Sequence, residues 1–197
     1  MTSMRVRKAM AATQLGDHHE AAELMDAALA DLRQSYPHGH RDLIDGLSIR
    51  ASIAIRSGAT QQAKPLLAEA LAMERALAAP RIPFLTSHHN NLAFAHAQLG
   101  ENEQAERHYR LALQTMLDSP IRDPIRTARA HWSLGAFLAM QGQWDEAKEC
   151  MQRAIRLREG MQNGNDRELM GWRAAVVRVD GRARGIDVEL PFETILH

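Results

Sequence analysis

The chain has 197 residues and a mass of 22.0 kDa, which suits one domain or a short array of repeats and argues against two large domains. Lys plus Arg and Asp plus Glu both total 24, so the zero net charge excludes a global field that directs the chain to nucleic acid or anionic membranes. Aromatic residues make up only 5% while alanine is abundant, which disfavours all-β folds and favours closely packed helices.

A glycine that recurs every 42 residues predicts the turn of each helical hairpin, at Gly16, Gly58, Gly100 and Gly142. Glycine ends helices because it adopts positive φ without a Cβ penalty. Alanines follow each glycine at offsets of 5 and 12 residues, and the two positions share one helix face because they lie nearly two turns apart. Small side chains on that face let a partner helix approach closely. The alanines are Ala21, Ala63, Ala105 and Ala147 at the first offset, and Ala28, Ala70, Ala112 and Ala154 at the second.

Taken in chain order, these signals predict four helix-turn-helix repeats in an array over residues 1–160. Proline-containing linkers separate the later repeats because proline ends one helix and starts the next. Each hairpin has an apolar face that only a neighbouring hairpin can cover, so we expect the repeats to stack. The repeats span about 2–37, 42–80, 84–120 and 125–160, with helices over 2–14 and 18–35, 42–56 and 60–79, 84–99 and 102–118, and 125–141 and 144–160.

The period is lost after Gly160, and residues 161–197 are predicted to be a C-terminal capping segment. A helix is expected over 167–179, because an array ends by covering its open apolar face. A turn is then expected over Gly181–Gly185. Apolar and acidic residues alternate over 186–190, which predicts an extended tail.

This pattern of glycine and alanine resembles the tetratricopeptide repeat, over about residues 4–160. The 42-residue period is similar to that of the longer variety found in kinesin light chains and in many bacterial signalling proteins. Residues 89–93 read His-Asn-Asn-Leu-Ala, and Asn-Asn-Leu-Ala recurs in the first helix of that variety. The resemblance implies an all-α solenoid of about four stacked hairpins. In this family the first helices line a concave surface where short extended peptides bind.

The chain departs from the repeat consensus at two places. Arg5 and Lys8 stand where the first helix is expected to carry large apolar residues, which favours a cap or a remnant of a repeat there. His89 and His131 replace the tryptophan that is usual early in the first helix of a repeat.

Offsets from the glycines predict which side chains face the concave surface. Asparagine amides can clamp a peptide backbone, arginine can bind a carboxylate, and an aromatic ring can anchor an apolar side chain. The alternative interpretation is that the asparagines tie neighbouring helices together and the aromatic residues belong to the core. The predicted groove residues are Asn90, Asn91, Phe94, Arg129, Trp132 and Arg56.

The ten histidines raise the question of a metal site, and His89, His96 and His131 could converge on one face. Without a cysteine pair or a His-Glu-x-x-His motif, we expect surface or inter-repeat histidines and no bound metal. Cys150 excludes an intramolecular disulfide because it is the only cysteine, and its helix position favours a core residue over a nucleophile. Motifs of hydrolases, phosphate-binding loops and dinucleotide-binding folds are missing from the sequence, so we expect neither an enzyme nor a cofactor.

The sequence therefore predicts a non-catalytic protein-protein interaction module that binds a peptide or a helical segment of a partner on its concave face. One alternative is a sensing or dimerising regulatory array of a bacterial signalling system, associated with a kinase or a transcription factor. A histidine-based metal protein or enzyme is the other. Nucleic acid and membrane partners are not expected, and a homo-oligomer stays open. The sequence shows neither a secretory signal nor an apolar run of about 20 residues, which makes the cytoplasm the expected location.

Overall fold

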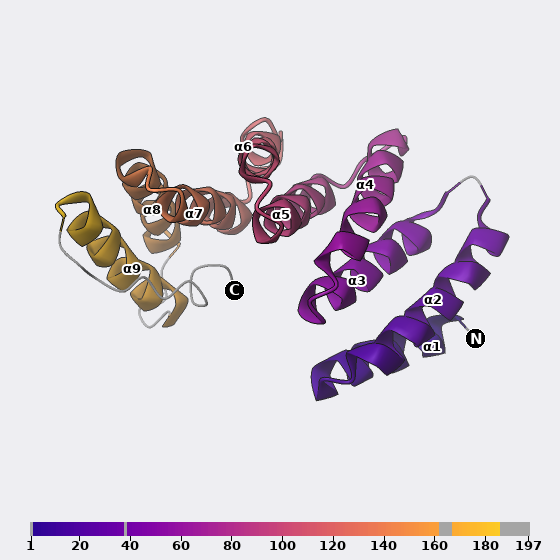
Figure 1. Ribbon diagram of the computed structural model, residues 1–197. Coiled ribbons are helices and arrows are strands. Elements are labelled where there is room, and N and C mark those ends of the chain that lie inside the picture. The colour runs from indigo at the N-terminus through magenta and orange to yellow at the C-terminus, as the bar shows by residue number, and fades with distance from the viewer. Residues whose placement is uncertain (1, 38, 162–166, 186–197) are drawn as a thin grey trace. The chain divides into compact units, whose positions relative to one another are not determined.

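The computed structural model describes residues 2–37, 39–161 and 167–185, and every regular element in these residues is an α-helix. The fold is an all-α solenoid built from helical hairpins, as predicted (Figure 1). The helices are α1 (Thr2–Leu15), α2 (His18–Ser35), α3 (Arg41–Arg56), α4 (Thr60–Ala76), α5 (Ile82–Gln98), α6 (Asn102–Leu117), α7 (Pro124–Met140), α8 (Trp144–Glu159) and α9 (Arg167–Ala183). None of the helices among the described residues is long and apolar enough to span a membrane.

The chain divides into two compact units, Met1–Ala105 and Glu106–His197. In the first unit, α1 to α5 pack each against the next along the chain, and α3 also contacts α5. In the second unit, α7 packs against α8 and α8 against α9. Helices that follow one another in sequence are thus neighbours in space, which is the arrangement expected of stacked hairpins.

The repeating glycines form the hairpin turns in a left-handed backbone conformation. In the first turn, the amide of Gly16 donates to the carbonyl of Thr13 and the amide of Asp17 to that of Ala12, which is the Schellman arrangement at a helix end. The third and fourth turns repeat these two hydrogen bonds at equivalent positions. The φ angles are 84° at Gly16, 80° at Gly58, 74° at Gly100 and 75° at Gly142.

Small residues set the distance between the two helices of a hairpin. All eight alanines of the repeat pattern are fully buried. The two helices of the last hairpin approach closely at Gly135 in α7, where a Cβ atom would lie 2.8 Å from Cγ of Met151 and 2.9 Å from the carbonyl oxygen of Ala147. Only glycine fits this contact between α7 and α8 without a shift of one helix.

Two predicted boundaries require correction. The helix expected over 60–79 ends at Ala76, and Leu77 is already extended, because the following Ala-Pro sequence disfavours helical backbone. The turn expected over Gly181–Gly185 is wrong, since α9 runs through Gly181 to Ala183 and the chain turns only at 184–185, where Gly185 has a φ of 76°. The extended tail predicted over 186–190 lies outside the described residues.

Candidate functional site

A cleft of about 570 Å³ lies between the first helices of the first two hairpins, within the first unit. This volume is in the range of sites that hold small ligands or a few side chains of a peptide. Three helices line the cleft: α1 with Ser3, Val6 and Arg7, the end of α2 with Leu32, Ser35 and Tyr36, and α3 with Asp42, Asp45, Gly46 and Ile49.

The floor of the cleft is apolar and closely packed. Leu32 is buried in the core that joins α2 to α3, and Ile49 is half-buried. A Cβ atom on Gly46 would lie 3.1 Å from a methyl group of Leu29 and 3.2 Å from one of Leu32, so glycine lets α3 approach α2 closely. The floor can therefore bury an aliphatic side chain from a ligand.

Charged side chains stand on the two opposite walls of the cleft. On the α3 wall, the side chain of Asp42 is 61% exposed and its carboxylate lies 3.5 Å from Nδ1 of His40. Asp45, one turn further along α3, is 40% exposed. On the α1 wall, the exposed Arg7 donates a long hydrogen bond of 3.4 Å to the carbonyl of Ser3.

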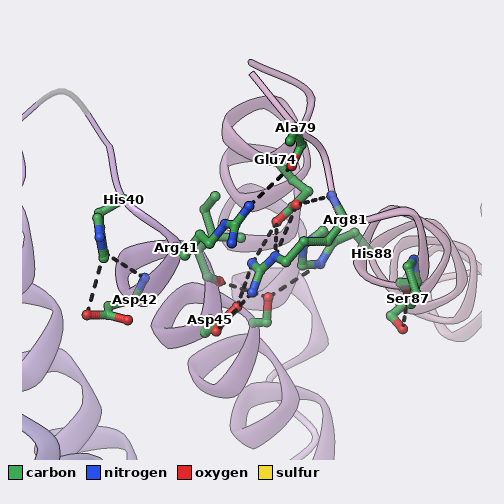
Figure 2. Close-up of polar contacts among 12 residues, drawn as sticks. His40, Arg41, Asp42, Asp45, Glu74, Ala79, Arg81, Ser87 and His88 are labelled. Atoms are coloured by element: carbon green, nitrogen blue, oxygen red, sulfur yellow. Dashed lines mark hydrogen bonds and ion pairs between the residues drawn. The ribbon is translucent and has the colours of Figure 1, made fainter. Parts of the chain in front are cut away.

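Asp45 is held in place by an ionic cluster that joins α3, α4 and the start of α5 (Figure 2). Arg81 donates from Nη2 to Asp45 at 2.8 Å and to Glu74 at 2.7 Å, and its backbone amide donates to Glu74 at 2.7 Å. The guanidinium also lies 3.7 Å from the centre of the Phe84 ring. We call Asp45, Glu74 and Arg81 the Arg81 clamp.

The clamp contains a carboxylate that has no contact with solvent. Glu74 is fully buried, and burial alone would raise its pKa, but the hydrogen bonds and charge of Arg81 outweigh burial and lower the pKa of this carboxyl. Both carboxylates in turn raise the pKa of Arg81, against the effect of its own burial. These shifts favour the ionised forms of Glu74 and Arg81 near neutral pH. With two carboxylates and one guanidinium, the clamp has a formal charge of one negative unit.

Two buried histidines on α5, His88 and His89, take part in contacts between helices. His88 is buried, its Nδ1 lies 3.3 Å from Oγ of Ser48, and burial lowers its pKa. His89 is also buried, and its Nε2 accepts a hydrogen bond of 2.8 Å from Arg75. In the part of the chain that the structure describes, no three His, Cys, Asp or Glu side chains are grouped so that they could hold a metal ion. Cys150 is half-buried, and burial raises the pKa of its thiol to about 11.

The groove residues predicted from sequence fall in both units. Asn90, Asn91 and Phe94 lie half-buried on α5, and Arg56 is exposed at the end of α3, all in the first unit. The Oδ1 atom of Asn90 is buried and has no hydrogen-bond partner among the described residues. Arg129, in the second unit, is exposed and lies 3.5 Å from a carboxylate oxygen of Glu168.

Trp132 requires a correction, because it is not open to a ligand. Its side chain is buried and stacks on Trp172 of α9, with ring centres 4.6 Å apart and an angle of 7° between the planes. A ring covered in this way stabilises the contact between α7 and α9. The sequence contained the signal for this pairing, since Trp172 lies on the apolar side of the predicted capping helix.

Sequence reasoning missed the cleft between α1 and α3. The groove residues predicted from the glycine offsets come from the second, third and fourth repeats. Arg5 and Lys8 favour a cap or a remnant of a repeat in the first helix, so no groove residue is predicted there. The structure shows that Arg5 pairs with Asp31 of α2, while Ala9 is buried in the core. The first helix therefore packs on α2 as part of the first hairpin, and it forms one wall of the cleft.

A model of the tetratricopeptide repeat family matches residues 84–160. This matched part of the chain, less than half of its length, is similar to tetratricopeptide repeats. The matched segment begins in α5 and ends just after α8, so it covers the third and fourth repeats. A sequence search of curated proteins finds no significant match.

Several solved structures share the fold at low sequence identity. TPR-like repeats of a Podospora anserina kinesin light chain match with a TM-score of 0.76 and 16% identity, over 93% of this chain and 88% of that one. BtubC from P. vanneervenii matches with a TM-score of 0.69 and 22% identity, over 92% and 80% of the two chains. A Rap protein complexed with competence and sporulation factor matches with a TM-score of 0.75 and 17% identity. The match covers 98% of this chain but only 51% of the Rap protein.

Proposed function

We propose that this protein is an interaction module that binds a peptide or a helical segment of a partner protein, with the cleft between α1 and α3 as its principal site. The observation that carries the proposal is the cleft itself, since it joins an apolar floor to charged walls on adjacent first helices. Apolar burial supplies affinity in such a site, and a few polar groups fix the orientation of the ligand. The Rap protein with the same fold, solved with competence and sporulation factor, supports this class of function.

Residues beyond the cleft extend the proposed surface. Arg56 and Asn91 belong to first helices of the same unit, and α3 contacts α5 there. Asn90 is proposed as a further contact on α5, since its side chain is half-buried and its Oδ1 has no hydrogen-bond partner among the described residues. Phe94 is proposed as a further contact on α5 of the same unit. Arg129 lies in the second unit and is proposed as a contact of that unit by itself. Trp132 is left out because Trp172 covers it.

The test is selection of peptides from a random 12-residue display library on the purified protein, followed by fluorescence anisotropy with the selected peptides. Ile49→Glu places a charge on the apolar floor, and we expect it to weaken binding by about tenfold or more, since each factor of ten equals about 1.4 kcal/mol. Ala68→Glu makes the same change in charge at an exposed position of α4 outside the cleft, and should leave binding unchanged. Circular dichroism checks that both variants keep wild-type helicity. Equal affinity of the two variants for the peptides would overturn the proposal.

A further inference from the structure

The charges that line the cleft are not balanced across its two walls. On the α3 wall, Arg81 serves two carboxylates, so the Arg81 clamp keeps one net negative charge. Asp42 adds a second negative charge, and its ion partner among the described residues is the exposed ring of His40 at 3.5 Å. On the α1 wall, Arg7 supplies a single positive charge.

Two other basic residues, one on α1 and one on α3, pair with carboxylates of α2. Arg5 binds Asp31, and Arg50 donates to Asp26 at 2.8 Å. Arg41, which precedes Asp42, does not line the cleft and donates to the carbonyl of Ala79 in the linker after α4 (Figure 2). The α3 wall is therefore acidic, and the opposite wall is basic only at Arg7.

We propose that the cleft selects a peptide in which a lysine or arginine stands beside an aliphatic residue. The basic group pairs with Asp42 and Asp45 on the α3 wall, and the aliphatic side chain lies on the floor near Ile49. Arg7 sets the direction of the peptide, because it repels the basic group from the α1 wall. The inference rests on the proposed function and adds the chemical class of the ligand.

The geometry of the α3 wall suits this selection. The Arg81 clamp fixes the Asp45 carboxylate through two hydrogen bonds of 2.8 and 3.2 Å, so this group need not be ordered again when a ligand binds. Asp42 lies one turn before Asp45 on the same helix face, which places both carboxylates on one side of an incoming side chain. A partly exposed carboxylate keeps most of its hydration in the free protein, so pairing it costs little desolvation.

The test uses the same 12-residue library, read as the frequency of Lys or Arg next to Leu, Ile, Val or Met. Wild-type protein should enrich this pair of residues. Asp42→Lys should weaken the affinity for the selected peptides by about tenfold. In a second selection, this variant should enrich Asp or Glu at the peptide position that holds Lys or Arg in the wild-type selection. Asp118→Lys makes the same change in charge at an exposed position directly after α6 in the other unit, and should leave the wild-type preference in place.

The outcomes separate this inference from the function on which it rests. Peptides that lose affinity with Ile49→Glu but bind equally well to Asp42→Lys would overturn the charge selection and leave the interaction module standing. Peptides that bind the Ile49→Glu variant as tightly as the wild-type protein would overturn both proposals. Enrichment of acidic peptides by the wild-type protein would also overturn the charge selection, since it would assign the ligand charge to Arg7.

Discussion

Two junctions in this molecule join a hairpin to the next helix, and they do so with different chemistry. In the first unit, the Arg81 clamp joins α3 and α4 to the start of α5 through charged hydrogen bonds around a fully buried Glu74. In the second unit, Trp132 of α7 and Trp172 of α9 stack face to face. Hairpins that share the same 42-residue period can therefore be joined to the next helix by charged side chains at one junction and by apolar contact at another.

The difference shows what the 42-residue pattern determines and what it leaves open. Each turn glycine and each repeat alanine does the same work in every hairpin, because these positions face the partner helix of the same repeat. The junction positions face the next repeat, whose residues differ. An ionic junction fails when either charge is removed, whereas an aromatic junction loses stability in proportion to the apolar area lost.

Arg81→Ala is expected to have the largest effect, because it leaves the buried Glu74 carboxylate without its counter-charge. We expect a loss of about 3–5 kcal/mol in the free energy of unfolding, measured by urea denaturation. Combining it with Glu74→Leu removes the buried charge as well and should recover most of that loss. A single variant as stable as wild type would show that the clamp contributes nothing to the first unit.

Trp172→Ala tests the aromatic junction, where no buried charge is stranded. The lost apolar burial should cost about 3 kcal/mol, with faster hydrogen exchange confined to the second unit. Protection of the amides in α3 and α4 should stay as in wild type. Faster exchange throughout both units would contradict the view that the two junctions act separately.

The sequence predicted the helices and their turns well because both depend on local residue types. Glycine and proline set the ends of the helices, and periodic alanines marked the buried faces. The Arg81 clamp could not be predicted in this way, since Glu74 lies in a helix and Arg81 in a linker, and their pairing with Asp45 depends on how one repeat meets another. The cleft was missed for the same reason, because its two walls belong to different hairpins.

Gly135→Ala tests close approach within a hairpin, apart from either junction. The added Cβ would lie 2.8 Å from Cγ of Met151, and we expect overpacking to cost about 1–3 kcal/mol of unfolding free energy. Gly171→Ala in α9 is the matched control, because a Cβ there meets nothing within 4 Å. That change should stabilise the helix by about 0.5–1 kcal/mol. If both substitutions stabilise the protein, α7 and α8 do not need glycine at their contact.

The smallest expected effect is a difference in pH dependence between two buried histidines. Burial lowers the pKa of both, but His88 faces Glu74, whose charge raises its pKa, whereas Arg153 and Arg156 lower the pKa of His131 further, to about 4. Between pH 6.5 and 4 the unfolded chain binds more protons at His131 than the folded chain does, so stability falls as the pH falls. The loss from His131 should reach about 1 kcal/mol between pH 7 and 5.5.

His131→Leu should remove that contribution and flatten the dependence of the urea midpoint on pH over this range. His88→Leu should flatten it less, because the charges of Glu74 and Asp45 offset part of the effect of burial on the pKa of His88. Glu74 acts in a lower window: its lowered pKa contributes stability above about pH 4.5 that is lost as the pH falls further, so it does not enter this comparison. Equal flattening by the two histidine variants would show that burial alone, and not the charge around each ring, sets their response.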